Sequence, residues 1–397
     1  MIQQTNFGMK KREPSLFILL LLVSFASVSA VLFTPALPEI SRDLGITTSQ
    51  AQLTISLFLI GFALGSLPYG PISNRYGRKT ATYIGLTLAM LGSLLIALSH
   101  DYQLFLLGRF LTALGSSVGM KIAFTMIGDV YDGPAATKKI SYMMLSFAIG
   151  PGAAIAIGGF LTTHFGWNSC FYFLIGYSLF MVFMTSLLPE TIKERDMEAL
   201  NFAKIKIGYL AKFKNKKLVT AALLMGGATS FVYLFASEAP FIAINQIGLS
   251  EESYGYLNFI PPIGMIAGTF LTNGLARRET LSVLLIGITI SLGAAALMLA
   301  LFLLGYLNRW TLFIPMPFLY IGLSLIYSNA SATALSVAKN KSNASAVMNS
   351  ISVATCVVIL FAVQALNLRA AFVLPLGFLM VCLLMLPLHQ RLAKLLG

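Results

Sequence analysis

The sequence predicts an all-α membrane protein whose chain crosses the bilayer twelve times. Hydrophobic residues make up 57% of the 397 residues and charged residues only 10%, whereas a soluble domain carries about 25% charge. Long apolar segments recur along the chain, separated by short polar breaks. About 20 apolar residues cross the hydrocarbon core as a helix. Because a helix satisfies its own backbone hydrogen bonds, such segments favour a helical bundle over a barrel.

Twelve apolar segments meet this length requirement. The first follows a basic stretch and contains a small-residue pattern at 28–30, as signal peptides do, but its apolar run continues to Leu37. We therefore expect it to be retained as a membrane helix. The predicted spans are 15–37, 50–72, 79–99, 103–127, 140–163, 168–188, 218–244, 253–276, 280–305, 310–337, 343–366 and 370–388.

The distribution of basic residues predicts the orientation of these spans. With both termini in the cytoplasm, all of the 27 lysine and arginine residues except Arg42, Arg309, Arg369, Arg109 and Lys121 lie in or beside inside loops. This asymmetry matches the positive-inside rule. The formal net charge of +13 is therefore attributed to loops that face an anionic inner leaflet, and not to nucleic-acid binding.

The longest polar break, 189–217, divides the chain into an N-terminal six-helix half at 1–188 and a C-terminal six-helix half at 218–397. The break itself is basic and is expected to be a cytoplasmic linker. Both halves carry two glycines four residues apart in their second span, Gly61 with Gly65 and Gly264 with Gly268. Such pairs let helices approach closely, and their matching positions suggest an internal duplication.

A glycine-rich basic turn, "GPISNRYGRKT" at 70–80, follows the second span. Gly70 and Gly77 permit a tight turn. Arg75, Arg78 and Lys79 can bind the carbonyl ends of neighbouring helices. We interpret this turn as an element of a cytoplasmic gate, and not as a substrate site.

Four stretches make the chain similar to the major facilitator superfamily, and most similar to its Bcr/CflA drug-resistance group. They are "TPALPEISRDLG" in span 1, "GPISNRYGRKT" after span 2, "LLGRFLTALGSSVG" in span 4 and "IGPGAAIAIGGFLTTHFGWNSCFYF" in spans 5 and 6. The resemblance covers nearly the whole length. It implies two six-helix halves and a bacterial inner-membrane transporter with cytoplasmic termini.

Three positions depart from the family pattern. Asn74 stands where the family usually has Asp, so we expect its hydrogen bond to arginine to be weaker by about 1 kcal/mol. Val31 stands where the group usually has an acid in span 1. In span 5, Gly158 and Gly159 lack the directly preceding proline, and Gly150 with Pro151 lies one to two turns earlier. These departures weaken the prediction of drug/proton antiport.

Three ionisable residues, Arg109, Glu238 and Lys121, fall within predicted spans and are the candidate coupling or substrate residues. A charge inside a span costs at least about 2.5–3.5 kcal/mol, so each suggests a function. Arg109 matches the family's span-4 arginine, which is linked to proton coupling, and Glu238 is a candidate replacement for the missing span-1 acid. The alternatives are an interfacial arginine, a solvated carboxylate at the mouth, and a lysine whose side chain reaches the inner leaflet.

The sequence argues against other kinds of site. Cys170, Cys356 and Cys382 form no CxxC pair, and the three histidines fall at span ends on different sides, so no metal site is predicted. There is no phosphate-binding loop and no nucleophile constellation, so we predict neither a cofactor nor an enzyme. Asp129 and Asp132 are expected to cap the inner end of span 4.

The function predicted from these features is proton-coupled efflux of a small amphipathic organic molecule by alternating access. The expected partners are that substrate, protons and membrane lipids, and the expected state is a monomer. The alternative within transport is an uptake or export carrier for an anionic metabolite or siderophore, which the missing span-1 acid and Lys121 would suit. The sequence does not identify the substrate.

Overall fold

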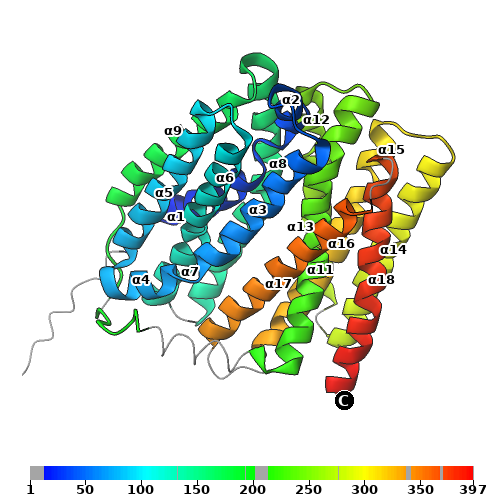
Figure 1. Ribbon diagram of the computed structural model, residues 1–397. Helices are drawn as coiled ribbons and strands as arrows, with labels where there is room; N and C mark the ends of the chain where they lie inside the picture. Colours follow the sequence, from blue (N-terminus) through cyan, green and yellow to red (C-terminus); the bar gives the residue numbers. More distant parts are fainter. Residues whose placement is uncertain are drawn as a thin grey trace, which may run out of the picture.

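The computed structural model is a bundle of helices that run roughly between two ends of the molecule (Figure 1). It describes residues 13–131, 133–192, 194–201, 213–275, 277–336, 341–366 and 370–396, and these contain no β-strand. Of the predicted basic positions, Lys10, Lys11, Arg12, Lys193, Lys339 and Arg369 lie outside the described residues, as do Asp132 and residues 202–212 of the predicted linker.

The N-terminal half comprises the elements up to α9. Three of its predicted spans are broken, at Leu32 and Phe33, at Leu67 and Pro68, and at Ser117. The elements are α1 Leu16–Val31, η1 Thr34–Ala36, α2 Leu37–Asp43, α3 Thr48–Ser66, α4 Tyr69–Tyr76, α5 Arg78–Leu98, α6 Tyr102–Ser116, α7 Val118–Val130, α8 Gly133–Phe165 and α9 Asn168–Ser186.

The C-terminal half comprises the elements from α11 onward. They are α11 Lys216–Pro240, the π-helical η2 Phe241–Gln246, α12 Glu251–Leu257, α13 Ile260–Gly274, α14 Thr280–Leu303, α15 Arg309–Phe313, α16 Pro315–Ser336, α17 Lys341–Gln364 and α18 Ala370–Leu396.

The predicted all-α membrane fold is confirmed. Ten helical segments are long and apolar enough to cross a membrane, and the apolar helix Ile149–Phe165 is shorter. With the interrupted pair α12–α13, these segments account for the twelve predicted spans. The spans are longer than predicted where amphipathic turns continue the helix, as in α4 and at the end of α18.

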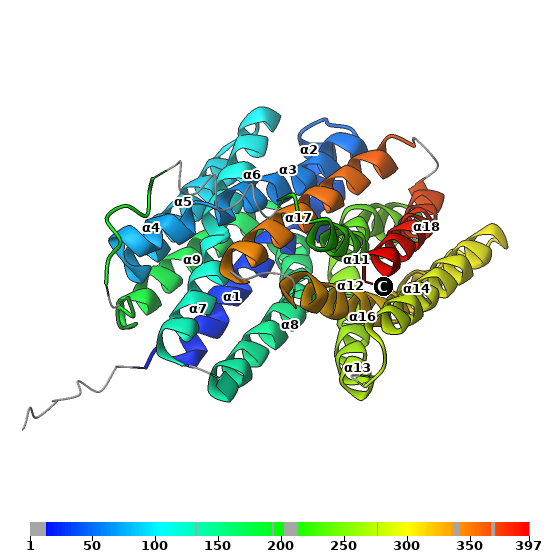
Figure 2. The same ribbon diagram turned by 90° about the horizontal axis from the view of Figure 1, so that it is seen from below.

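The two ends of the bundle differ in charge. The end that carries Arg75, Arg78, Lys79, Arg391 and Lys394, at the bottom of Figure 1, is called the basic end here. The opposite end, where α2, α12 and α15 lie, is called the top end. Figure 2 shows the bundle from the basic end.

The two halves repeat the same helix contacts. In the N-terminal half α6 packs on α3 and α5, and in the C-terminal half α16 packs on α13 and α14. A Cβ on Gly61 of α3 would lie 2.8 Å from the Phe110 carbonyl oxygen of α6, and a Cβ on Gly264 of α13 would collide with the Pro317 carbonyl oxygen of α16. The predicted glycine pairs therefore serve equivalent helix contacts in both halves.

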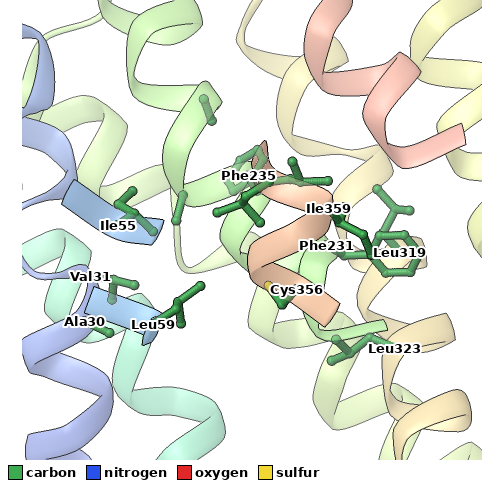
Figure 3. Packing of buried hydrophobic residues seen from close by; sticks show 14 of the residues in the cluster. Ala30, Val31, Ile55, Leu59, Phe231, Phe235, Leu319, Leu323, Cys356 and Ile359 are labelled. Atoms are coloured by element: carbon green, nitrogen blue, oxygen red, sulfur yellow. The ribbon is translucent and has the colours of Figure 1, made fainter. Parts of the chain in front are cut away.

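An apolar seam joins the halves. One hydrophobic core contains residues of both halves. Figure 3 shows side chains of α1 and α3 on one side of the seam and side chains of α11, α16 and α17 on the other. The labelled residues are Ala30, Val31, Ile55, Leu59, Phe231, Phe235, Leu319, Leu323, Cys356 and Ile359. Apolar contacts of this kind are non-directional.

Substituting Gly264 by alanine tests the close α13–α16 contact. The added methyl would overlap the backbone of Pro317, so we expect a loss of about 1–3 kcal/mol of stability and a lower thermal unfolding midpoint in detergent. Gly293→Ala in α14 is the matched control, because a Cβ there meets nothing within 4 Å. Equal midpoints for the two variants would contradict the proposed packing role.

Candidate functional site

Arg109 of α6 is completely buried inside the N-terminal half. Its guanidinium donates to the carbonyl oxygens of Ser29 at 2.9 Å and Ala30 at 3.2 Å. Its central carbon lies 4.0 Å from the ring centroid of Phe33 and 4.4 Å from that of Phe58. The arginine therefore ties α6 to the end of α1 and to the middle of α3.

The break in the first span explains why α1 can accept this arginine. The α1 helix ends at Val31, and Pro35 in the following turn has no backbone N–H to donate. The last carbonyls of a helix have no partner within it. Arg109 supplies donors to two such groups and places a positive charge at the negative end of α1.

Glu238 lies at the seam, close to the top end of α11. Its side chain is 3% exposed, and its Oε1 atom is buried without a hydrogen-bond partner. The polar side chain that faces it from the other half is Gln52 of α3, whose Nε2 donates to the Ser237 carbonyl oxygen at 3.5 Å. Two residues later Pro240 ends the regular helix, and a π-helical turn follows. π-Helical turns occur often at functional sites.

Lys121 lies on α7, apart from Glu238 and close to the basic end. A Cβ on Gly70 of α4 would lie 3.6 Å from the Lys121 Cε atom. The absence of a side chain at Gly70 therefore makes room for this half-buried lysine. The structure does not bring Arg109, Glu238 and Lys121 into one cluster.

Arg78, at the start of α5, is the centre of a polar cluster that we call the latch: Ser73, Asn74, Arg78 and Asp129. Its Nε is 2.9 Å and its Nη2 3.3 Å from the two Asp129 carboxylate oxygens, and its Nη1 donates to Ser73 at 2.9 Å and to Asn74 at 2.6 Å. Asp129 was expected only to cap a helix, but it supplies the carboxylate that Asn74 lacks. All four members of the latch belong to the N-terminal half.

Glu190, at the start of the linker, binds the turn between α4 and α5. Its carboxylate accepts the backbone N–H groups of Arg78 at 2.9 Å and Lys79 at 3.1 Å, so it caps the positive end of α5. Gly77 has φ +103°, and a Cβ there would lie 2.5 Å from Glu190 Oε2. The sequence analysis missed Glu190, because nothing local indicates that it caps a helix more than a hundred residues earlier.

The other basic residues of the turn have separate contacts. Lys79 Nζ donates to the carbonyl oxygen of Ser186 at the end of α9, at 2.9 Å. The Arg75 guanidinium carbon lies 5.5 Å from the Tyr76 ring centroid. Lys79 therefore joins α5 to α9, while Arg75 stays at the surface of the turn.

The span-5 glycines bring α8 against two neighbours. A Cβ on Gly158 would collide with the Leu32 carbonyl oxygen of the first span, and a Cβ on Gly159 with the Glu251 carbonyl oxygen of α12 in the other half. A Cβ on Gly150 would lie 2.6 Å from the Ser27 Oγ atom of α1. Pro151 lies inside α8, and no polar contact assigns it a further role. Gly150 and Gly158 thus allow close packing within the N-terminal half, and Gly159 allows it across the seam.

Polar contacts close the seam at the top end. The Glu252 backbone N–H of α12 donates to Thr163 Oγ1 of α8 at 3.2 Å. The Glu252 carboxylate lies 3.6 Å from His164 Nε2 and accepts the Tyr256 hydroxyl at 3.0 Å. The His164 and Glu252 side chains are both partly exposed, so the contribution of this ion pair to stability is small.

Moving a carboxylate within the latch tests its charge pairing. Asp129→Asn removes the charged partner of Arg78, and we expect this to cost about 1.5–3 kcal/mol and lower the thermal unfolding midpoint. Adding Asn74→Asp to that variant places a carboxylate oxygen where the Asn74 Oδ1 atom lies, 2.6 Å from Arg78 Nη1. This second change should restore most of the lost stability. If the double variant is no more stable than Asp129→Asn, charge pairing is not the source of the stability.

A cross-link tests the closed top end. Cysteines that replace Thr163 and Glu252 should be joined by a short bifunctional thiol reagent in the purified protein, because their parent residues are in hydrogen-bond contact. The native cysteines are buried and should react slowly. A Thr163→Cys, Lys394→Cys pair, whose members lie at opposite ends of the bundle, is the control. Equal yields from the two pairs would exclude a closed top end.

Comparison with known proteins gives the family. The model of the Major Facilitator Superfamily matches residues 19–363. Multidrug resistance protein D of Escherichia coli is 24% identical over 321 residues, 81% of this chain and 80% of that protein. The bicyclomycin resistance protein homolog of Haemophilus influenzae is 25% identical over 333 residues, 82% of this chain and 83% of that protein.

A solved structure shares the fold. The crystal structure of a D-xylose–proton symporter superposes with a TM-score of 0.74 and 13% sequence identity, over 94% of this chain and 96% of that one. At this identity the likeness concerns the fold alone. Because the family model covers most of the sequence, the chain belongs to the Major Facilitator Superfamily, whose members are transporters and not enzymes.

Proposed function

We propose that this protein exports small amphipathic organic molecules in exchange for protons, by alternating access between two six-helix halves. The observation that carries the proposal is Glu238, a carboxyl group buried at the seam with one oxygen unpartnered. Burying a carboxylate without a charged or hydrogen-bonded partner is costly, so a closed seam favours the neutral acid. Opening the seam to water would release the proton.

The substrate class and the direction rest on the relatives. Multidrug resistance protein D and the bicyclomycin resistance protein homolog carry names that indicate resistance to organic compounds. Resistance by a transporter is achieved by moving the compound out of the cell. In this proposal the amphipathic molecule crosses at the apolar seam between the halves, where Glu238 couples its passage to a proton.

The orientation follows from charge. We place the basic end in the cytoplasm of a bacterium and the chain in its inner membrane, with both termini inside, because basic residues gather at that end. The structure then corresponds to a state closed toward the outside, in which α8 meets α12. We propose that a monomer is the working unit, because each half of the transport path is present in one chain.

Arg109 and Lys121 have supporting roles in this proposal. Arg109 fixes the end of α1 against α6 and so determines where the first span meets the seam. Lys121 lies next to Gly70 of α4, and we assign it to the gate. Its position away from Glu238 gives no support to the alternative of an anionic metabolite or siderophore.

The Glu238→Gln variant tests the coupling. We expect bacteria that lack other efflux systems to accumulate less of a fluorescent drug when they express the protein, and a protonophore to abolish the difference. Glu238→Gln should lose this effect, because glutamine keeps the shape but carries no exchangeable acid proton. The exposed Glu279 supplies the matched control, Glu279→Gln, which should behave like the unmodified protein.

A second measurement separates coupling from binding. In vesicles that contain the purified protein, Glu238→Gln should still exchange labelled for unlabelled drug but should not concentrate it against a pH gradient. A variant that concentrates drug normally would refute the role of Glu238. Failure of the unmodified protein to move any drug in the panel would refute the substrate class.

A further inference from the structure

A groove of about 690 Å³ lies on the surface of the N-terminal half, between α1, α8 and α9. These three helices are mutual neighbours, and α1 lies between α9 and α8 when the bundle is viewed from the basic end (Figure 2). The floor of the groove is α1, from Leu16 to Val28, and its walls are α8, from Tyr142 to Ile157, and α9, at Phe173 and Tyr177.

The groove offers an occupant almost no free polar group. Ser24 and Ser146 share a hydrogen bond of 2.6 Å, and Ser146 is also 3.1 Å from the Leu20 carbonyl oxygen. The Tyr177 hydroxyl donates to the Leu21 carbonyl oxygen at 2.9 Å. The inner surface is therefore suited to a hydrocarbon chain, which makes no hydrogen bonds.

The groove is separate from the seam. On α8, the residues that meet α12 and α13 are Gly152, Ile155, Ala156 and Gly159. The groove residues Tyr142, Ile149, Ala153 and Ile157 lie on a different face of the same helix, because 3.6 residues make one turn. Tyr142, Ile149 and Ile157 are each at least 40% exposed, so this face opens to the surroundings of the bundle, which in a membrane are lipid.

The length of the groove matches one lipid chain. Leu16 and Val28 are twelve residues apart on α1, which corresponds to about 18 Å along the helix. Half of a hydrocarbon core of about 30 Å is about 15 Å. The groove therefore extends over the depth of one leaflet, beginning at the basic end, where α1 starts.

Lysines lie at that end of the groove. Lys138 and Lys139 precede Tyr142 by four and three residues on α8, so they lie on the same face of the helix as Tyr142. Lys139 Nζ lies 4.3 Å from the Tyr131 ring centroid, and the Tyr131 hydroxyl donates to Glu13 at 2.6 Å. Lys138 is exposed. A phosphate at this position would meet a cation just beyond the apolar groove.

We propose that the groove binds one acyl chain of an anionic phospholipid, whose phosphate is held by Lys138 at the basic end. The apolar lining, the one-leaflet length and the lysine at one end together fit this ligand. The site would take its ligand from the bilayer, and it requires neither export nor proton coupling.

Retention of defined lipids by the purified protein tests the proposal. The probes are phosphatidylglycerol and phosphatidylethanolamine, added in equal amounts in detergent and counted per protein molecule by native mass spectrometry. We expect preferential retention of one phosphatidylglycerol. Lys138→Gln should weaken it about fivefold, the factor that corresponds to about 1 kcal/mol per lysine near an anionic surface. Lys394→Gln, at the end of α18, is the control for charge.

A second pair of variants tests the groove itself. Ala153→Trp should displace the lipid by filling the groove, while Leu285→Trp, at an exposed position of α14, should not. Thermal unfolding midpoints establish that both variants are folded. Equal retention of the two lipids, or retention unchanged in Ala153→Trp, would overturn the proposal. Displacement of the lipid by a transported drug would instead make the groove a substrate path and would also overturn it.

Discussion

The proposed coupling between the two halves and the proton depends on one constraint, the burial of the Glu238 carboxyl group in a seam that is otherwise apolar. Side chains of α1 and α3 lie on one side of this seam and side chains of α11, α16 and α17 on the other (Figure 3), and these apolar side chains cannot stabilise a charge. Among the residues that the structure describes, Gln52 is the polar side chain that faces Glu238 from the other half. A closed seam therefore requires a neutral acid, and an open seam permits a charged one. In the proposed mechanism this requirement links the position of the halves to proton binding.

In the proposed mechanism each half moves as a unit, and the contacts within each half are suited to this. Glycines let α3, α5 and α6 pack backbone against backbone, and the equivalent helices α13, α14 and α16 do the same. Arg109 ties α6 to the broken end of α1, and the latch with Glu190 ties α4 and α5 to α7 and to the start of the linker. Most of the strong polar contacts thus lie within a half, whereas contacts across the seam are apolar or exposed apart from those of Gln52. In the proposed mechanism the halves separate along this seam.

Much of the fold could be predicted from the sequence, because twelve apolar runs and the distribution of basic residues leave few arrangements. The glycine pairs at Gly61 and Gly264 also indicated the repeated contact correctly. The site was harder to predict. Buried charges identified Arg109 and Glu238 as unusual, but only the structure shows that Arg109 binds the end of α1 while Glu238 lies at the seam. Glu190 was missed, and Asp129 was predicted only as a helix cap, because their partner, Arg78, is distant in sequence and local patterns carry no information about such pairs.

Infrared spectroscopy of the purified protein at neutral pH tests the central claim most directly, because the C=O stretch of a protonated carboxylic acid is separate from the bands of a carboxylate. The account predicts a carboxylic acid band in the unmodified protein that is absent from Glu238→Gln and still present in Glu279→Gln. Identical spectra for the unmodified protein and Glu238→Gln would show that the buried carboxyl group is charged when the seam is closed. That result would contradict the proposed link between closure of the seam and protonation of Glu238.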